Sequence, residues 1–503
     1  MTKGIILLSI VLLCISGCKY EPPASASSLT EESIALDFSR TFAVGGTYSS
    51  GFMDGALFTD GQKYSYPNLF AQSLSEIYER DIFIQADIES ENGFNLEEGD
   101  NTKGKYKLVY ESLSSMYVKR IPESGQQIGN WSGDDTDLND YSFPGLKVHE
   151  LLNSNGDTNN PYYNRVEGLN GSIIDQIVDK NPTMVILSLG NEDVLSFAFN
   201  GASGSDQPNL NTITEIDLIK PEDFQNIAVS IVNKIINETD AEIFIANVIN
   251  PIETPFFNEI DWALELQEYD TSYIAAAGRF YEELNEQIAK HNFVENGSLP
   301  LSERRSIINF QLDAYCEVPT LICEIPFFID RVNRARVIED EYLDSDTLSD
   351  GTILPKIRQL TEGEKILYDN LPNLHRESLL SGIQPLNDSQ VLTHDEIVVI
   401  ENRIQSYNQI LDGIAGSSNR IYLLDFHSVI EKLQANELND DGVFYTNQFD
   451  ELSFYSSDGY TINRRGQAFL ANTLIEKLNE ISESNVPKLK PNLFEGNKIE
   501  IGL

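Results

Sequence analysis

The chain has 503 residues, of which 41% are hydrophobic and 23% are charged, which is the profile of a globular protein with a sizeable core. Its formal net charge is −44. That charge argues against nucleic-acid binding, because phosphate recognition needs patches of Lys and Arg. It also disfavours electrostatic docking on anionic lipid and indicates a soluble, self-repelling surface.

The chain begins with a pattern that is typical of export. Residues 5–15 form an apolar run that is too short to span a bilayer as a mature helix and fits the core of a signal peptide. The run ends in Ile15-Ser16-Gly17-Cys18, which resembles the lipobox of bacterial lipoproteins. That resemblance implies that residues 1–17 are removed and that Cys18 carries several acyl chains, as stable anchoring requires. Residues 18–34, rich in Pro, Ser and Glu, are predicted to form a flexible tether.

The body of the protein, residues 35–480, is predicted to be one α/β domain. Buried strands are expected at residues 41–44, 183–189, 242–248 and 420–426, and helices at 69–77, 224–236 and 464–480. Apolar strands that alternate with helices predict a parallel sheet covered on both faces.

Two insertions interrupt the predicted order of strands and helices. Residues 82–120 alternate polar and apolar side chains and are interpreted as an inserted hairpin. Residues 255–395 form a longer, partly helical insertion, which we interpret as an elaboration on one side of the core. Residues 481–503 are interpreted as a C-terminal tail.

Four segments at predicted strand ends and loops carry the candidate site, because functional residues of doubly wound folds follow the carboxyl ends of the strands. These segments are Gly45-Gly46-Thr47-Tyr48-Ser49, Pro144-Gly145-Leu146-Lys147, Gly190-Asn191-Glu192-Asp193 and Asp458-Gly459-Tyr460-Thr461-Ile462. In order and context they resemble the four sequence blocks of the SGNH (GDSL-type) hydrolases. The resemblance implies a flavodoxin-like, three-layer α/β/α fold with large insertions, and no cofactor or metal is expected.

The resemblance also implies that most of the catalytic residues are lost. Thr47 stands where the family has its nucleophilic Ser, and Thr461 stands where it has the catalytic His. Glu192 replaces the Asn whose amide donates to the oxyanion. Gly145, whose backbone N–H helps to bind the oxyanion, and Asp458 are retained.

These replacements argue against ester hydrolysis by the family mechanism. A Thr hydroxyl needs an adjacent base, and Thr461 does not titrate near neutral pH. Glu192 adds a carboxylate where negative charge would develop, a repulsion on the order of 4 kcal/mol at about 4 Å and an effective dielectric near 20. The Asp or Asn that precedes the family's nucleophile aligns with Gly46. His427, just after Asp425 at the end of a predicted strand, is an alternative base that could approach the site.

Two further motifs leave alternatives open. Cys316 and Cys323 could close a small disulfide loop in an oxidising compartment, or could remain two buried thiols. Asp135-Thr136-Asp137-Leu138-Asn139 begins like a calcium-binding loop. It lacks the Gly and the final Glu that an EF-hand requires, so it is not expected to bind calcium.

Three functions therefore remain open. The leading hypothesis is an inactive, lipid-anchored binding or scaffolding subunit at the outer membrane. For such proteins, the resemblance suggests a β-barrel protein or a barrel-assembly or surface-display complex as the partner. The second hypothesis is an active esterase or lipase that uses Thr47. The third is a protein that keeps a lipid or glycan pocket without turnover. The sequence leaves open whether the body faces the periplasm or the cell surface.

Overall fold

The computed structural model describes residues 36–501, except 96–102, 111–117, 154–159, 170, 265–270, 296, 311–330 and 371–382. Cys18 and the pair Cys316 and Cys323 lie outside the described residues, so the anchor and the disulfide stay predictions. Within the described residues, no helix is both long enough and apolar enough to cross a membrane.

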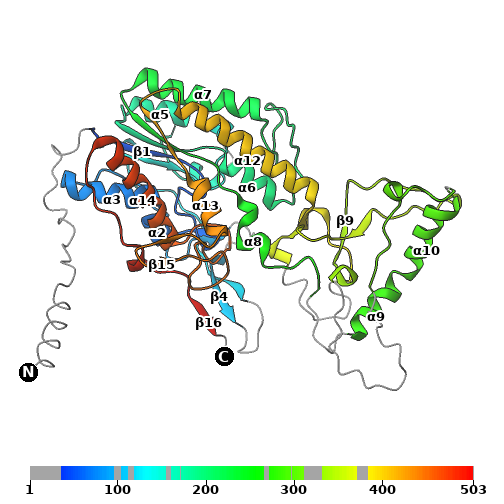
Figure 1. Ribbon diagram of the computed structural model, residues 1–503. Coiled ribbons are helices and arrows are strands. Elements are labelled where there is room, and N and C mark those ends of the chain that lie inside the picture. The colour runs from blue at the N-terminus through cyan, green and yellow to red at the C-terminus, as the bar shows by residue number, and fades with distance from the viewer. Residues whose placement is uncertain are drawn as a thin grey trace, which may run out of the picture.

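A five-stranded, all-parallel sheet forms the centre of the protein (Figure 1). Its strands in chain order are β1 (Thr41–Gly45), β6 (Asp140–Ser142), β7 (Met184–Ser188), β8 (Glu242–Ala246) and β13 (Ile421–Leu424). In space the order is β13-β8-β7-β1-β6, which is the 2-1-3-4-5 order of flavodoxin-like sheets. Every residue of β1 and β7 is buried, because helices cover both faces.

Helices form the two outer layers of the fold. One layer contains α5 (Ile173–Asp179), α6 (Asn191–Phe199), α7 (Pro221–Glu238) and α12 (His394–Ala415). The other contains α3 (Tyr66–Tyr78), α13 (Phe426–Gln434) and α14 (Arg464–Ser482). Phe224 of α7 stacks on Tyr407 of α12 with ring centroids 3.8 Å apart. The α/β architecture with three layers is confirmed.

The inserted hairpin lies later in the chain than predicted. It consists of β4 (Lys103–Tyr110) and β5 (Lys119–Ser124), which pair antiparallel. Residues 82–90 have no regular strand, although Ile82 and Ile88 are buried. Side chains serve as hydrogen-bond partners for some backbone groups of this segment: the N–H of Ile88 donates to Gln62 Oε1 at 2.7 Å. An alternating pattern therefore also fits an irregular segment that is tied down by side chains.

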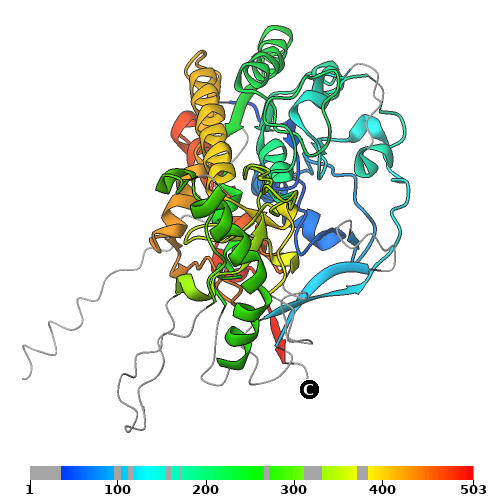
Figure 2. The same cartoon turned by 90° about the vertical axis from the view of Figure 1, so that its right-hand side faces the viewer.

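The C-terminal residues extend the hairpin sheet. The last helix continues to Ser482, and β16 (Ile499–Ile501) pairs in parallel with β4. Figure 2 shows β16 beside the hairpin. The remaining short elements outside the large insertion are β2 (Ala56–Leu57), α2 (Thr59–Lys63), β3 (Phe94–Asn95), α4 (Pro161–Asn164), β14 (Asn439–Asp440) and β15 (Val443–Phe444).

Much of the large insertion forms a lobe that projects from the sheet domain (Figures 1 and 2). Its elements are α8 (Pro255–Asn258), α9 (Thr271–Phe280), α10 (Glu282–Lys290), β9 (Val337–Glu339), β10 (Ile357–Gln359), β11 (Lys365–Ile366) and β12 (Val391–Leu392). The lobe has a small apolar core of its own, which includes Tyr281, Ile308 and Val337. At its base, Phe256 and Ile366 belong to the main core.

Candidate functional site

The four candidate segments meet at the carboxyl ends of β1, β6 and β7. Thr47 follows β1, Gly145 follows β6, and Glu192 lies in the first turn of α6, directly after β7. The loop of Asp458 joins them, since the N–H of Gly55 donates to Asp458 Oδ2 at 2.8 Å. The strand order reverses at β1, where open α/β sheets bind their ligands. The sequence thus predicted the convergence of these segments.

The side chain of Glu192 fills the position next to Thr47. The backbone N–H of Thr47 donates to Glu192 Oε1. A Cβ atom added to Gly46 would lie 2.2 Å from Glu192 Cγ, so Glu192 occupies space that any other residue at position 46 would need. Backbone N–H groups at such turns stabilise the anions that form during acyl transfer. Here an internal carboxylate already holds that donor.

Glu192 is buried, with 6% of its surface exposed. Burial raises the pKa of its carboxyl from 4.5 to about 7, although hydrogen bonds from the side chain and backbone of Thr47 act in the opposite direction. The negative charge of Asp193 raises this pKa further, and the charge of Lys147 lowers it. Near neutral pH the group is therefore divided between its neutral and ionised forms.

A buried ionic cluster lies beside Glu192. The Lys147 ammonium donates to the backbone oxygen of Asp217 at 2.8 Å. Burial lowers the pKa of Lys147, although the negative charges of Asp193 and Glu192 act to raise it. Asp193 is fully buried, and its pKa is raised by burial. Burial lowers the pKa of His149, whose Nδ1 has no hydrogen-bond partner among the residues that the structure describes. In the sequence, His149 is marked only by its position four residues after Gly145.

Asp458 and Thr461 form a closed hydrogen-bonded turn, and both side chains are fully buried. Asp458 Oδ1 accepts the N–H groups of Tyr460 and Thr461 at 2.9 and 2.8 Å. Its Oδ2 accepts the Thr461 hydroxyl in addition to the N–H of Gly55. The Thr461 hydroxyl also lies 2.8 Å from Ser456 Oγ. Both residues that align with the family's acid and base are therefore committed to holding this loop.

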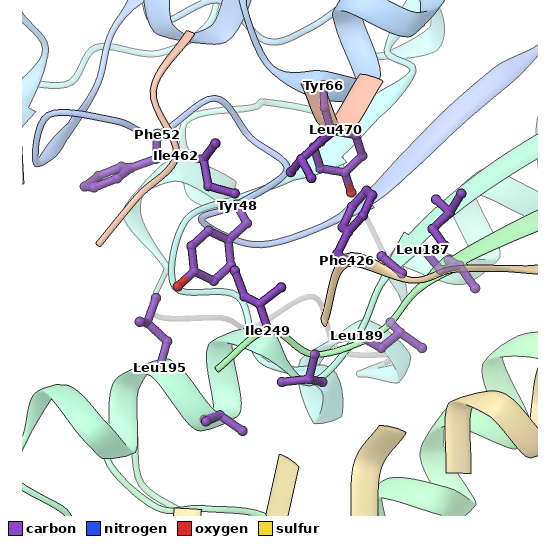
Figure 3. Packing of buried hydrophobic residues seen from close by; sticks show 14 of the residues in the cluster. Tyr48, Phe52, Tyr66, Leu187, Leu189, Leu195, Ile249, Phe426, Ile462 and Leu470 are labelled. Atoms are coloured by element: carbon purple, nitrogen blue, oxygen red, sulfur yellow. The ribbon is translucent and has the colours of Figure 1, made fainter. Parts of the chain in front are cut away.

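Large side chains pack around Tyr48, the residue that follows Thr47 (Figure 3). Tyr66 of α3 meets Phe426 of α13 edge-to-face, with ring centroids 5.2 Å apart. Ile249 completes the packing, and the Tyr48 hydroxyl is buried without a partner in the described part of the chain. The cavity they enclose is about 10 Å³, which is close to the minimum for one water molecule. This cavity, which Thr47 does not line, is too small for an acyl chain or a sugar ring.

Both insertions meet over the Asp458 loop. Arg120 of β5 donates to the backbone oxygen of Asp458 at 2.9 Å. Its guanidinium lies 5.3 Å from the ring centroid of Phe256 and 4.9 Å from that of Tyr368, both in the large insertion. It also forms an ion pair with Asp369. Cationic and aromatic groups buried in this arrangement attract one another, so Arg120 fastens the two insertions to the loop.

Two other candidates do not contribute as expected. Gly145 is exposed with a φ of +80°, and it precedes a short 3₁₀ helix, η4 (Val148–Leu152). His427 follows β13, which is three strand spacings from β1, or about 14 Å. Its Nδ1 lies 3.1 Å from the backbone oxygen of Val248, and it lines a separate cavity of about 480 Å³. The contacts of His427 are therefore with residues other than Thr47, and they do not support a role as its base.

The calcium-like segment is occupied by a lysine side chain. The Lys180 ammonium donates to the backbone oxygens of Asp135 and Leu138 at 2.6 and 2.9 Å. A positive charge held at these oxygens opposes binding of a second cation there.

No protein-family model matches the chain, and no curated protein is significantly similar to it. The likeness to SGNH hydrolases therefore rests on the four segments, their convergence and the strand order. Family membership stays a proposal.

Proposed function

We propose that the protein is a catalytically inactive relative of the SGNH hydrolases that serves as a lipid-anchored binding or scaffolding subunit at the outer membrane. The observation that carries this proposal is the hydrogen bond from the Thr47 amide to the buried carboxylate of Glu192. It blocks the position where an ester would react. The closed Asp458–Thr461 turn supports the same conclusion.

Exposed apolar side chains on the projecting lobe support a binding role. They include Phe280, Phe293, Val294, Leu301, Ile307 and Ile353, which are between 49% and 84% exposed. We propose that these side chains contribute to one contact surface, because contiguous exposed apolar surface marks sites of protein contact. Together with the predicted anchor at Cys18, this lobe favours a partner at the membrane, and we propose an outer-membrane β-barrel protein or its assembly or surface-display complex.

Affinity purification of the tagged full-length protein from solubilised outer membranes tests the subunit role. We expect a stoichiometric membrane partner in the eluate. Phe293→Asp should release it, because it places a charge in the proposed contact surface. Phe444→Asp is the matched control, since Phe444 is 65% exposed on β15 of the sheet domain. Recovery of the wild-type protein alone, or equal losses in both variants, would count against the proposal.

An ester hydrolase is the second candidate, and one contact favours it. The Thr47 side chain bonds to a carboxyl whose pKa is about 7, and a base of that pKa suits proton transfer at neutral pH. Purified mature protein should nevertheless leave short acyl esters intact, because both side chains are buried. Hydrolysis that is abolished by Thr47→Ala and by Glu192→Gln would establish the enzyme and overturn the inactive assignment.

A further inference from the structure

Three carboxylates gather where the large insertion meets the N-terminal end of α12. Glu341 lies between β9 and β10, Asp388 begins a short 3₁₀ helix, η10 (Asp388–Gln390), and Glu396 lies in the first turn of α12. One oxygen from each carboxylate lies within 4.8 Å of the other two. Glu341 is exposed, Asp388 is half-buried and Glu396 is buried, with 1% of its surface exposed. Figure 1 shows this end of α12 reaching the base of the lobe.

Two oxygens of this cluster are buried without a hydrogen-bond donor. Glu396 Oε2 accepts the N–H and the hydroxyl of Thr393 at 2.6 and 2.8 Å. The other oxygen, Glu396 Oε1, has no partner among the described residues, and neither does Asp388 Oδ1. An unsatisfied buried acceptor is costly, most of all when it carries charge. These oxygens therefore call for a positively charged ligand.

The positive side chains nearby are used elsewhere. Arg358 pairs with the neighbouring carboxylates Asp340 and Glu364 at 2.5 and 2.6 Å. Lys356 donates to the backbone oxygen of Glu341 at 2.9 Å rather than to its carboxylate. Within the part of the chain that the structure describes, no Lys or Arg forms an ion pair with any of the three carboxylates of the cluster.

The protonation behaviour of the cluster agrees with this imbalance. Burial, reinforced by the negative charge of Glu341, raises the pKa of Asp388 to about 6. Burial also raises the pKa of Glu396 to about 7, and the charges of Asp388 and Glu341 contribute. Without a cation the cluster relieves its repulsion by taking up protons.

We propose that Glu341, Asp388 and Glu396 form a binding site for Ca²⁺. The ligand atoms are all oxygens of carboxylates, which hard divalent cations prefer. Oxygens that lie within 4.8 Å of one another fit around Ca²⁺, whose ligands lie at about 2.3–2.6 Å in flexible geometry, whereas Mg²⁺ demands a near-ideal octahedron. Backbone oxygens and water complete the coordination, because Ca²⁺ takes about six to eight oxygens.

The bound ion would fasten the lobe to the sheet domain. Glu341 and Asp388 belong to the insertion, whereas Glu396 belongs to α12, which packs on α7, α6 and β13. Calcium binding would therefore fix the orientation of the lobe that carries the exposed apolar residues.

Terbium luminescence provides a direct test, because Tb³⁺ substitutes for Ca²⁺ and is sensitised by a nearby tyrosine. Tyr342 follows Glu341, and the charges of Glu396, Glu341 and Asp388 add to burial in raising the pKa of its hydroxyl to about 12. The full mature chain should give saturable luminescence on tyrosine excitation. Added Ca²⁺ should displace Tb³⁺ at much lower concentration than Mg²⁺.

Matched variants separate this site from general binding to an acidic surface. Glu341→Gln and Asp388→Asn should weaken Tb³⁺ binding about tenfold or more, since affinity follows the number of charged ligands. Glu341 is exposed, so its substitution leaves the fold intact. Glu401→Gln changes an exposed carboxylate on the same helix and should have no effect. Absence of saturable luminescence, equal binding in all variants, or equal displacement by Mg²⁺ would overturn the proposal.

Discussion

The buried carboxyl of Glu192 gives the sharpest prediction of pH dependence. Its pKa is raised from 4.5 to about 7, so folding takes up a proton between these values. The free energy of unfolding should therefore fall as the pH rises from about 4.5 to about 7 and stay constant above that range. Each pKa unit corresponds to about 1.4 kcal/mol, so the ionised Glu192 costs the folded state about 3 kcal/mol.

The variant Glu192→Gln isolates this contribution, because glutamine keeps the size of the side chain and an oxygen that accepts the Thr47 N–H. Urea unfolding of the wild type and the variant should give similar stabilities near pH 4.5. Near pH 8 the variant should be more stable by about 3 kcal/mol. Other titrating groups are common to both proteins and cancel in the difference. Glu401→Gln, which changes an exposed carboxylate, should differ from the wild type by an amount that does not vary with pH. A stability difference for Glu192→Gln that does not vary with pH would refute the reasoning.

Two further predictions concern contacts of the site, and a third concerns the predicted anchor. Gly46→Ala should lower the free energy of unfolding by about 1–3 kcal/mol through overpacking against Glu192. The loss should disappear when Glu192 is replaced by Ala, as chemical denaturation of the wild type, the two single variants and the double variant would show. Arg120→Ala should lower the free energy of unfolding by about 2–3 kcal/mol, because the guanidinium contacts several aromatic rings. Amide hydrogen exchange should accelerate in the Asp458 loop, and unchanged exchange there would contradict the proposed role of Arg120. Cys18→Ser should move the protein from the membrane fraction to the soluble fraction, and persistent membrane association would remove the case for lipidation.

The sequence predicted the central strands well, because burial on both faces leaves a simple signal. The runs at 183–189 and 242–248 correspond to β7 and β8 with ends within two residues. It missed β6, whose residues Asp140-Tyr141-Ser142 are mostly polar. That strand is stable at the sheet edge because Asp140 is bonded, at 2.8 Å, by the Gln85 amide. Such compensation comes from a distant segment and leaves no local pattern.

The candidate site was predictable in position but not in chemistry. Strand ends located Thr47 and Glu192, because the carboxyl ends of parallel strands share one edge of the sheet, whereas Asp458 lies in a loop before α14. The contact between Gly46 and Glu192 depends on two segments that are far apart in the chain, so neither residue alone indicates it. The same holds for Arg120, whose partners come from both insertions.

The geometry also predicts that no single substitution restores a hydrolase. Thr47→Ser would supply the family's nucleophile but leave the Glu192 carboxylate on its amide. Glu192→Asn would free that amide but supply no base. Thr461→His would place an imidazole at a fully buried position that now bonds to Asp458 and Ser456, where overpacking costs about 1–3 kcal/mol. Activity needs a nucleophile, a base and an oxyanion donor together, so each of these single variants should be as inactive as the wild type.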